Sequence, residues 1–600
     1  YTTLVALDVE GNVDQTQLPV ATSFTFTHDS ATATLPDVEV YTVVQPALVV
    51  SNVSVAPTSV KAGMVVTYSL EVKHLSNSTA NAFDLVVVGS VPADLQIVSA
   101  DNSSFPCQFT IANDNRSVTF VLSELALGSS FTARFDAVVL ASVVPGQVGI
   151  VSSVAVQYDT NPLAFAGYAG RPLNATKVSP ALSVNGPSFE FGYSSSSIGS
   201  TLGSEVAIGE GVYFATRITL LEGTSVIQVS IALPASGRLG HVASSLWLAG
   251  PVNCTQALAV TASSTAILYD LGSCTNRPDG VDNEAMNIVI NTTVVVLDAD
   301  ANVYPSEMTV SATFQYSNGT AGLASATHDD VLQVVEPVLQ TSIYTATASA
   351  DAGDLVMYVV GVWHEGSHSD GFDVTLTARV PADVLVVSAQ DGNLGGSAAI
   401  SGDQQTVTFT LPVVALGSMY NTTFVAAVQQ AVRPAESGLF AVANLTYDSN
   451  PGLFSGTYNG RTGTASAVSN TFTVPEPVYN SATVNTSIAS TGGLAVTIGE
   501  AIVLKTAANM TEGTANVTFV VTLPEGLMAA ISSTVEYGSG QNCSVAAGAI
   551  TALGNSSTLI YSLGECVNVG DNDTANNVES IRVYTTLVAL DVEGNVDQTQ

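Results

Sequence analysis

The sequence predicts an all-β protein built from several antiparallel β-sandwiches, and three observations support this fold class. Hydrophobic residues make up 46% of the 600 residues, whereas charged residues make up only 11%. That balance excludes intrinsic disorder, because disordered chains combine low hydrophobicity with a high density of charge. Valine and threonine, which favour strands, abound, while Lys, Glu, Arg and Leu, which favour helices, are scarce. The third observation is a hydrophobic alternation with a period of two residues.

This alternation identifies individual strands. In VTYSLEV (66–72), valine, tyrosine and leucine alternate with threonine, serine and glutamate, and SVTFVLS (117–123) and TVTFTL (406–411) repeat the pattern. Runs of about five to eight such residues, bounded by Gly, Pro, Asn and Asp, are typical of antiparallel sandwiches. The sequence contains no convincing amphipathic helix.

The chain also contains a long repeat. The segment YTTLVALDVEGNVDQTQ occupies both 1–17 and 584–600, so identical residues lie 583 positions apart. A diverged version, TTVVVLDADANV, begins at Thr292, and its continuation through THDD at Thr327 resembles the continuation through THDS at Thr27. We therefore expect the chain to be a window on a tandem array with a period of 583 residues, and the polypeptide to continue beyond both ends.

A second periodicity divides this repeat into halves. VPADLQIVSAD from Val91 resembles VPADVLVVSAQD from Val380, and LYDLGSC, ending at Cys274, resembles IYSLGEC, ending at Cys566. Each half splits into an A-type and a B-type unit of ordinary domain size. The predicted domains are 1–36, the closing part of a B-type sandwich; 37–183, A-type; 184–336, B-type; 337–476, A-type; and 477–600, an incomplete B-type sandwich closed by the equivalent of 1–36.

One stretch resembles a known class of surface protein. The order IGE, hydrophobic alternation, then LPxGL occurs most fully in residues 66–100, and LPEGL (523–527) echoes it. This resembles the conserved-repeat β-sandwiches of bacterial and algal surface proteins, which implies tandem Ig-like antiparallel β-sandwiches in a linear array. The chain also looks like fibrous extracellular glycoproteins such as flagellar hairs or surface fibrils, which implies a structural role.

Sixteen Asn-x-Ser/Thr sequons predict N-glycosylation. Roughly seven would be expected by chance, so the enrichment favours a secreted glycoprotein whose N-glycans are its covalent modification. The glycans would also solvate a surface with few charges. The acceptor residues are Asn52, Asn77, Asn102, Asn115, Asn174, Asn253, Asn291, Asn318, Asn421, Asn444, Asn485, Asn509, Asn516, Asn542, Asn555 and Asn572.

The five cysteines are consistent with the same compartment. Cys254 and Cys274 occupy places in one B-type unit that correspond to Cys543 and Cys566 in the other. The preferred interpretation is one disulfide in each B-type unit, contributing about 3 kcal/mol; the alternative is two pairs of buried thiols. Cys107 has no counterpart, and a buried thiol is preferred to an inter-chain bridge.

Acidic turns are the candidate Ca²⁺ sites. Short Asp/Asn turns with spaced oxygens can hold Ca²⁺, but the same residues form ordinary β-turns, and no complete twelve-residue loop is present. We prefer the ordinary turn. The candidate ligands are Asp279, Asp282, Asp298, Asp300, Asp571 and Asp573.

The motif HEGSH (364–368) matches the H-E-x-x-H signature of zinc hydrolases, which requires a helix. It follows the strand-like MYVVGVW and contains Gly366, so a turn at a strand end is the preferred interpretation. The sequence also lacks a Walker loop, a dinucleotide fingerprint and a Gly-x-Ser-x-Gly elbow. An enzyme is therefore not expected, and no catalytic or cofactor-binding residue is predicted.

The charge balance limits the partners. Fourteen Lys and Arg against fifty Asp and Glu give a net charge of −36, which disfavours nucleic acid and anionic membranes. No apolar run reaches the roughly eighteen residues of a membrane span, and the first residues do not resemble a signal peptide.

These observations predict a structural repeat subunit of an extracellular, N-glycosylated filament at the cell or flagellar surface, whose partner is a further copy of itself. Linkers such as VVEPVLQ (334–340) and VPEPVYN (474–480) place proline between units, which stiffens the joints. The alternatives are the stalk of a cell-surface adhesin, and a non-covalent fibre in which residues 1–36 complete a neighbour's B-type unit by strand donation.

Overall fold

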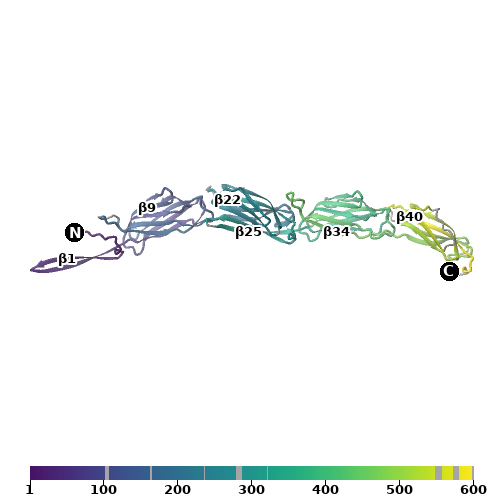
Figure 1. Cartoon of the computed structure of the whole chain (residues 1–600), viewed down its shortest axis with the longest axis horizontal. Coiled ribbons are helices and arrows are strands. Elements are labelled where there is room, and N and C mark those ends of the chain that lie inside the picture. Colours follow the sequence, from purple (N-terminus) through teal and green to yellow (C-terminus); the bar gives the residue numbers. More distant parts are fainter. Residues whose placement is uncertain are drawn as a thin grey trace. The chain divides into compact units, whose positions relative to one another are not determined.

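The computed structural model of the chain is all-β, which confirms the predicted fold class (Figure 1). It describes residues 1–101, 107–162, 165, 167–235, 237–278, 287–319, 322–546, 557–571 and 580–596. Within these ranges the backbone forms strands, turns and irregular segments, without a helix. Accordingly, the described residues supply no helix long and apolar enough to cross a membrane.

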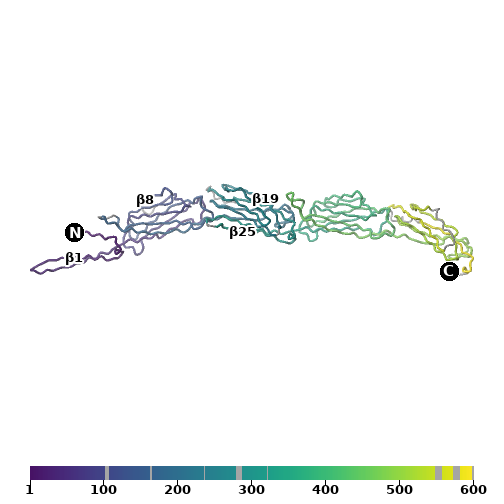
Figure 2. The backbone as a smooth tube through the Cα atoms, in the orientation of Figure 1, coloured from purple at the N-terminus to yellow at the C-terminus, as the bar shows by residue number. Residues whose placement is uncertain are grey.

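The chain divides into two compact units. The first comprises Tyr1–Ser195, Val212–Val294 and Met308–Leu332, and the second comprises Ser196–Gly211, Val295–Glu307 and Gln333–Gln600. The backbone can be followed from the purple N-terminus to the yellow C-terminus in Figure 2. Because this division passes through the strands between residues 188 and 335, the predicted domain boundaries remain predictions.

The first sandwich packs a four-stranded sheet against a five-stranded sheet. Its core contains residues of both sheets, such as Tyr68 and Phe120, and the rings of Tyr68 and Phe135 stack 4.8 Å apart. The strands in sheet order are β3 (Leu48–Ala56), β5 (Val65–His74), β10 (Ser130–Val139) and β7 (Leu95–Asp101); then β13 (Pro172–Val178), β12 (Ser153–Asp159), β6 (Ala82–Ser90), β9 (Ser117–Leu125) and β8 (Gln108–Ile111); with a small sheet of β11 (Val148–Ile150), β14 (Leu182–Val184) and β4 (Ser59–Val60).

The second sandwich has the same two-layer plan. Large side chains from each sheet, including Phe214 and Phe314, are buried. Its strands are β15 (Ser188–Ser196), β17 (Gly211–Thr219), β23 (Ile288–Val296) and β19 (Leu239–Leu248); then β16 (Glu205–Ala207), β25 (Leu323–Val335), β24 (Glu307–Ser317), β18 (Gly223–Ala232), β22 (Ala266–Asn276) and β20 (Val252–Cys254), with β21 (Ala259–Ala262) also paired to β22.

The third sandwich repeats the first. Its core contains Tyr358, Phe409 and Phe424, and the rings of Tyr358 and Phe424 stack 4.9 Å apart, as Tyr68 and Phe135 do. Its strands are β26 (Leu339–Thr345), β27 (Leu355–His364), β32 (Met419–Val428) and β29 (Val384–Ala389); then β30 (Ser397–Ile400), β31 (Thr406–Val414), β28 (Gly371–Arg379), β33 (Val442–Asp448) and β34 (Thr462–Val468).

The fourth sandwich corresponds to the second but has fewer strands. Its strands are β35 (Val478–Thr486), β36 (Ala501–Asn509), β41 (Ser580–Ala589) and β38 (Met528–Tyr537); then β37 (Gly513–Thr522), β40 (Thr558–Asn568) and β39 (Gln541–Cys543). In the second sandwich β18 pairs with β22 on one side and β24 on the other. Its counterpart β37 pairs with β40, and among the described strands nothing pairs with its other edge.

The strands that correspond to β24 and β25 lie at the start of the chain. β1 (Gln17–His28) and β2 (Ala31–Thr42) form an isolated antiparallel hairpin with Gln17 opposite Thr42. Figure 1 shows it extending away from the strands of the first sandwich. Phe24, Phe26, Leu35 and Tyr41 are exposed on it.

Candidate functional site at the sandwich junctions

The two predicted disulfides are present. Cys254 is bonded to Cys274 with an S–S distance of 2.08 Å, and Cys543 is bonded to Cys566 at 2.10 Å. Each bond joins directly opposed residues of neighbouring strands, β20 with β22 and β39 with β40. The disulfides therefore hold a short outer strand to its sheet. Cys107 is half-buried against the core of the first sandwich and is not in a disulfide.

The sequons lie at accessible positions wherever the structure describes them. Asn102, Asn555 and Asn572 fall outside the described residues. None of the described acceptors is buried, so a glycan at any of them would not disturb a core. Exposed acceptors are Asn52, Asn77, Asn174, Asn253, Asn291, Asn421, Asn444, Asn485, Asn516 and Asn542; half-buried ones are Asn115, Asn318 and Asn509.

The candidate Ca²⁺ ligands are not gathered by the part of the chain that the structure describes. Asp279, Asp282 and Asp573 lie outside it, and within it no three His, Cys, Asp or Glu side chains form a group that could hold a metal ion. Asp300 is exposed, while the Asp298 carboxylate accepts a hydrogen bond from an arginine. Calcium binding stays a prediction.

The HEGSH motif forms a turn rather than a helix. His364 is the last residue of β27, and its Nε2 lies 3.0 Å from the carbonyl oxygen of Val414. The ring of His368 stacks on Tyr304 with centroids 3.8 Å apart. The two histidines therefore have separate partners.

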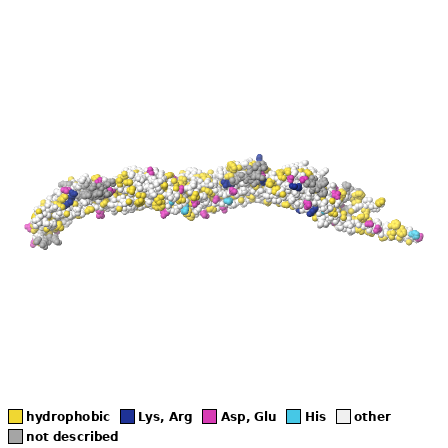
Figure 3. Space-filling view, turned by 180° about the vertical axis from the view of Figure 1, so that it is seen from behind, with side chains coloured by type: hydrophobic (Ala, Val, Ile, Leu, Met, Phe, Trp, Pro, Cys, Tyr) yellow, Lys and Arg dark blue, Asp and Glu magenta, His cyan; other side chains and the backbone are white. Residues whose placement is uncertain are grey.

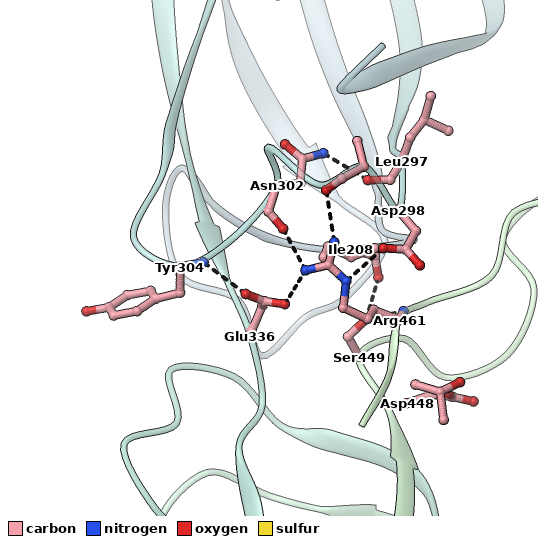
Figure 4. Close-up of polar contacts among 11 residues, drawn as sticks. Ile208, Leu297, Asp298, Asn302, Tyr304, Glu336, Asp448, Ser449 and Arg461 are labelled. Carbon is pink, nitrogen blue, oxygen red and sulfur yellow. Dashed lines mark hydrogen bonds and ion pairs between the residues drawn. The ribbon is translucent and has the colours of Figure 1, made fainter. Parts of the chain in front are cut away.

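A cluster of polar contacts surrounds Arg461 in the second unit (Figure 4). Its Nε donates to Asp298 Oδ1 at 2.7 Å, and its Nη1 donates to Glu336 Oε1 at 2.7 Å. Nη1 and Nη2 also donate to the carbonyl oxygens of Asn302 and Ala299, at 2.8 and 2.9 Å. Burial lowers the pKa of Arg461, but the hydrogen bonds with the two carboxylates outweigh it and raise the pKa above its ordinary value. The guanidinium thus ties the third sandwich to the loop after β23 and to Glu336, between β25 and β26.

Two neutral contacts beside Arg461 complete this junction. Ser449 Oγ donates to the carbonyl oxygen of Ile208 at 2.9 Å, and Asn450 Nδ2 donates to that of Gly209 at 2.8 Å. Gly209 has φ +85°, and a Cβ there would lie 2.7 Å from the carbonyl oxygen of Asn459. Only glycine fits this close approach between backbones.

The first unit contains a similar clamp with two of these contacts. Arg171 Nε donates to Asp8 Oδ1 at 2.5 Å, and Nη2 donates to the carbonyl oxygen of Val9 at 2.8 Å. Asp8 and Val9 correspond to Asp298 and Ala299, since each pair follows the same TTxVxLD motif. Among the described residues, an arginine–aspartate contact of this kind is therefore present on both the first and the third sandwich.

An asparagine closes the loop that each clamp grips. Asn12 Nδ2 donates to the carbonyl oxygen of Leu7 at 2.8 Å, and Asn302 Nδ2 donates to that of Leu297 at 2.8 Å. In a third copy of this loop, Asn595 Nδ2 donates to the carbonyl oxygen of Leu590 at 2.7 Å. The loop is therefore preformed, which presents its aspartate and its carbonyl oxygens in a fixed arrangement.

The junction between the first and second sandwiches, within the first unit, contains a buried ion pair. Lys61 Nζ lies 3.4 Å from Glu222 Oε2, and both residues are buried. Gly223 follows with φ +141°, where a Cβ would lie 2.8 Å from the carbonyl oxygen of Val143. This junction is as close-packed as the one at Gly209.

The corresponding junction between the third and fourth sandwiches has two acidic residues in place of this ion pair. Asp351 occupies the position of Lys61, and Glu512 occupies that of Glu222. Burial, followed by the negative charge of Asp351, raises the pKa of Glu512 to about 7, although the Asp571 N–H donates to its carboxylate at 3.3 Å. Two carboxylates therefore face each other where the first unit has an ion pair.

The arrangement of these residues is a set of clamps rather than a reaction centre. Arg461 donates four hydrogen bonds, to two carboxylates and two carbonyl oxygens, and these partners lie 125 to 163 residues away along the chain. Sequence reasoning singled out Asp298 as a turn residue and candidate Ca²⁺ ligand and did not assign a role to either arginine. The available signal was the Gly-Arg pair that follows YDTNP and YDSNP (Gly170-Arg171 and Gly460-Arg461).

No known protein family matches the sequence, and no curated protein matches it. Among solved structures, the chain is similar to the C-terminal domain of the AgI/II polypeptide BspA of Streptococcus agalactiae, at 8% identity over 48% of this chain and 99% of that one, with a TM-score of 0.26. It is also similar to BcpA, the major pilin subunit of Bacillus cereus, at 13% identity over 60% and 88% of the two chains, with a TM-score of 0.21. Scores this low carry no functional information.

Proposed function

We propose that the chain is a structural repeat of an extracellular, N-glycosylated filament with a period of 583 residues. The observation that carries this proposal is the recurrence of one junction: the arginine clamp of Arg461 on Asp298 is repeated by Arg171 on Asp8. A contact that recurs with the half-repeat is what a protein needs when similar units must follow one another in a fixed orientation.

The work of such a filament is mechanical. The charged hydrogen bonds at each junction resist bending and separation of neighbouring sandwiches, and the disulfides hold β20 and β39 to their sheets. The proposed domains are those predicted from the sequence, namely 1–36, 37–183, 184–336, 337–476 and 477–600. Catalysis forms no part of this function, and Ca²⁺ would be an accessory ligand of the acidic turns at most.

Accessible sequons and paired cysteines support secretion. Disulfides persist in oxidising compartments, and N-glycans are added to chains that enter the secretory pathway. The proposed partner is a further copy of the repeat, at the cell or flagellar surface.

Electron microscopy of the purified native protein tests this function. The expected result is a filament with a regular axial repeat in the absence of any added ligand. Short unbranched particles capped by a domain unlike these sandwiches would instead support the stalk of an adhesin.

A further inference from the structure

We propose that the N-glycan carried by Asn421 lies on the apolar outer face of its own sheet in the third sandwich, where its first sugars cover Trp363 and the neighbouring side chains. This inference rests on the N-glycosylation in the proposed function and assigns one glycan a binding surface. The sheet consists of β26, β27, β32 and β29, and Asn421 lies in β32, one of the two central strands.

The outer face of this sheet is apolar and carries no charge. Along β27 and β32 every second side chain is buried, so the residues between them face outward. The four strands contain no Asp, Glu, Lys or Arg. A contiguous apolar surface of this kind marks a contact surface in soluble proteins. Its most exposed apolar residues, each at least 50% exposed, are Tyr344, Leu355, Met357, Val387 and Met419.

The corresponding face of the first sandwich is charged. VTYSLEVKH (66–74) in β5 aligns with VMYVVGVWH (356–364) in β27, since they share two Val, the Tyr and the final His at the same spacing. The strand pairs β5–β10 and β27–β32 also have the same register. The third sandwich therefore replaces four charged residues with uncharged ones: Glu71 with Gly361, Lys73 with Trp363, Arg134 with Thr423, and Asp136 with Val425.

Asn421 lies where a glycan reaches this face directly. It is opposite Gly361 in β27, while Trp363, two residues further along β27, is opposite Met419. A Cβ at Gly361 would lie 3.0 Å from Asn421 Oδ1, so the Asn421 side chain extends over the glycine. The missing side chain at Gly361 leaves space for a sugar beside Trp363.

The surface beside Asn421 is also hollowed. The hollow has a volume of about 530 Å³ and is lined in part by Val359 and by the turn of residues 390–393. Asn393 holds this turn against β32, because its Oδ1 accepts from the Asn421 N–H at 2.9 Å and its Nδ2 donates to the Met419 carbonyl oxygen at 3.0 Å. An apolar floor with a polar rim matches a sugar, whose ring has apolar C–H faces and hydroxyl groups at its edge.

Trp363 supplies the stacking surface. It is half-buried, so part of its ring remains accessible. The face of an aromatic ring carries partial negative charge, whereas the C–H groups of a sugar ring are polarised positive by the neighbouring oxygens. The two surfaces therefore attract each other, and the hydroxyl groups of the sugar stay in water. One glycan thus gives an apolar face a hydrated cover.

The acceptor on the opposite sheet of the same sandwich has different surroundings. Asn444 in β33 is exposed, and its cross-strand neighbours are Thr377 in β28 and Ser466 in β34. These hydroxyl side chains need no cover and offer no ring for stacking. Asn444 is therefore the matched control.

Tryptophan fluorescence tests the proposal, because the chain has two tryptophans. The full secreted chain with Trp247→Phe keeps Trp363 as its only tryptophan, and peptide mass spectrometry reads the occupancy of each acceptor. In this background Asn421→Gln should raise the acrylamide-quenching constant of Trp363 at least about twofold, because the stacked sugar covers the face of the ring that the protein leaves open. Asn444→Gln should leave the quenching constant unchanged.

Two variants at Thr423 separate the effect of the glycan from that of the Asn421 side chain. Thr423→Ala removes the sequon and keeps Asn421, whereas Thr423→Ser retains the sequon. Only Thr423→Ala should reproduce the increased quenching. Binding of an apolar dye such as ANS should rise in Asn421→Gln and in Thr423→Ala, because the apolar face is uncovered, and should not rise in Asn444→Gln.

Two results would overturn the proposal. If Asn421 is occupied and Asn421→Gln changes neither quenching nor dye binding, the glycan points away from the sheet. If Asn421 is unoccupied in the native protein, no glycan covers the face. Burial of Trp363 on association of such unoccupied chains would then identify a second copy as the occupant.

Failure of this inference can be distinguished from failure of the proposed filament. Native filaments without a glycan at Asn421 would leave the filament standing and contradict the covered face. Chains that form no filament but show the expected changes in quenching would support the covered face and contradict the filament.

Discussion

At the residue scale, the two corresponding junctions differ at one charged position. Lys61 faces Glu222 in the first unit, whereas Asp351 occupies the equivalent position beside Glu512 in the second. A buried carboxyl without a cationic partner keeps its proton more readily, so its pKa rises. In the second unit the protonation of Glu512 therefore becomes part of the stability of the junction.

The raised pKa of Glu512 predicts a pH dependence of stability. Its ordinary value is 4.5 and its folded value is about 7, so the folded state binds the proton more tightly than the unfolded state. The contribution of Glu512 to the free energy of unfolding should therefore be largest below pH 4.5. It should fall as the pH rises to about 7. Calorimetry across this range should show the decline.

Asp351→Lys is the matched variant, because it copies the pair of the first unit. It should lower the pKa of Glu512 and remove the decline between pH 4.5 and pH 7. Asp351→Asn should have a smaller effect in the same direction. An unchanged pH profile in Asp351→Lys would show that Asp351 does not influence Glu512.

Removal of the Arg461 clamp should destabilise the third sandwich. Arg461→Gln leaves Glu336 and Asp298 without their cation, and hydrogen bonds to charged groups contribute about 1.5–3 kcal/mol each. We expect the free energy of unfolding in denaturant to fall by about 2 kcal/mol. Arg379→Gln, at an exposed position of β28, serves as the control and should change it little. Equal effects of the two variants would contradict the clamp.

At the scale of elements, strands were predictable and their register was not. The alternation in residues 66–72 and 406–411 lies in β5 and β31, with the apolar side chains buried. The expected equivalence of THDS with THDD was wrong, because His28 ends β1 at the hairpin turn whereas Thr327 lies inside β25. A four-residue motif can recur by chance. The loops closed by Asn12 and by Asn302 make the same hydrogen bond, so they show which residues of the two copies correspond.

Two glycine turns with the same backbone but different surroundings give a controlled comparison. Gly209 and Gly499 have φ +85° and +82°, and only Gly209 is covered by Asn459. Gly499→Ala should cost about 1–2 kcal/mol from the left-handed conformation. Gly209→Ala should cost about 1–3 kcal/mol more, because the added methyl overlaps the backbone. Denaturant unfolding at concentrations where the chain is monomeric measures both. Equal costs would show that the junction adapts.

The disulfide in the fourth sandwich should be a major source of its stability. It closes a loop with a sequence separation of 23 residues. The double substitution Cys543→Ser and Cys566→Ser should lower the free energy of unfolding by about 3 kcal/mol. Reductant should have a larger effect on the unaltered chain than on the variant, in which it can break only the Cys254–Cys274 disulfide. Cys107→Ser should keep the sensitivity to reductant.

At the scale of the whole molecule, the proposed N-glycans would supply the solvation that sparse charge does not. Lys and Arg are sparse on the face shown in Figure 3, and the chain has 64 charged residues in 600. The secreted protein should be treated with an amidase that releases N-glycans and leaves Asp at each site that carried one. Peptide mass spectrometry should then show the occupied acceptor Asn residues as Asp. Removal of the glycans should lower solubility, because the exposed apolar residues lose their hydrated cover. A secreted protein without any converted site would contradict N-glycosylation.

Local and periodic features were determined by the sequence itself. Alternation gave the strands because side chains of a strand point to opposite faces, and corresponding cysteines indicated the disulfide pairs because the repeat preserves spacing. The repeat also located the loop at residues 7–12 and its copies. Each of these features depends on residues close in sequence or related by a fixed period.

The roles of charged residues were decided by the tertiary structure alone. Arg461 meets Asp298 across 163 residues, and Glu512 lies beside Asp351 across 161 residues. Nothing in local sequence fixes such distances, because they depend on how the faces of folded sandwiches pack. The sequence alone thus determined the strands and the disulfide pairs of the sandwiches. Only the packed junctions determined which residues hold one sandwich to the next.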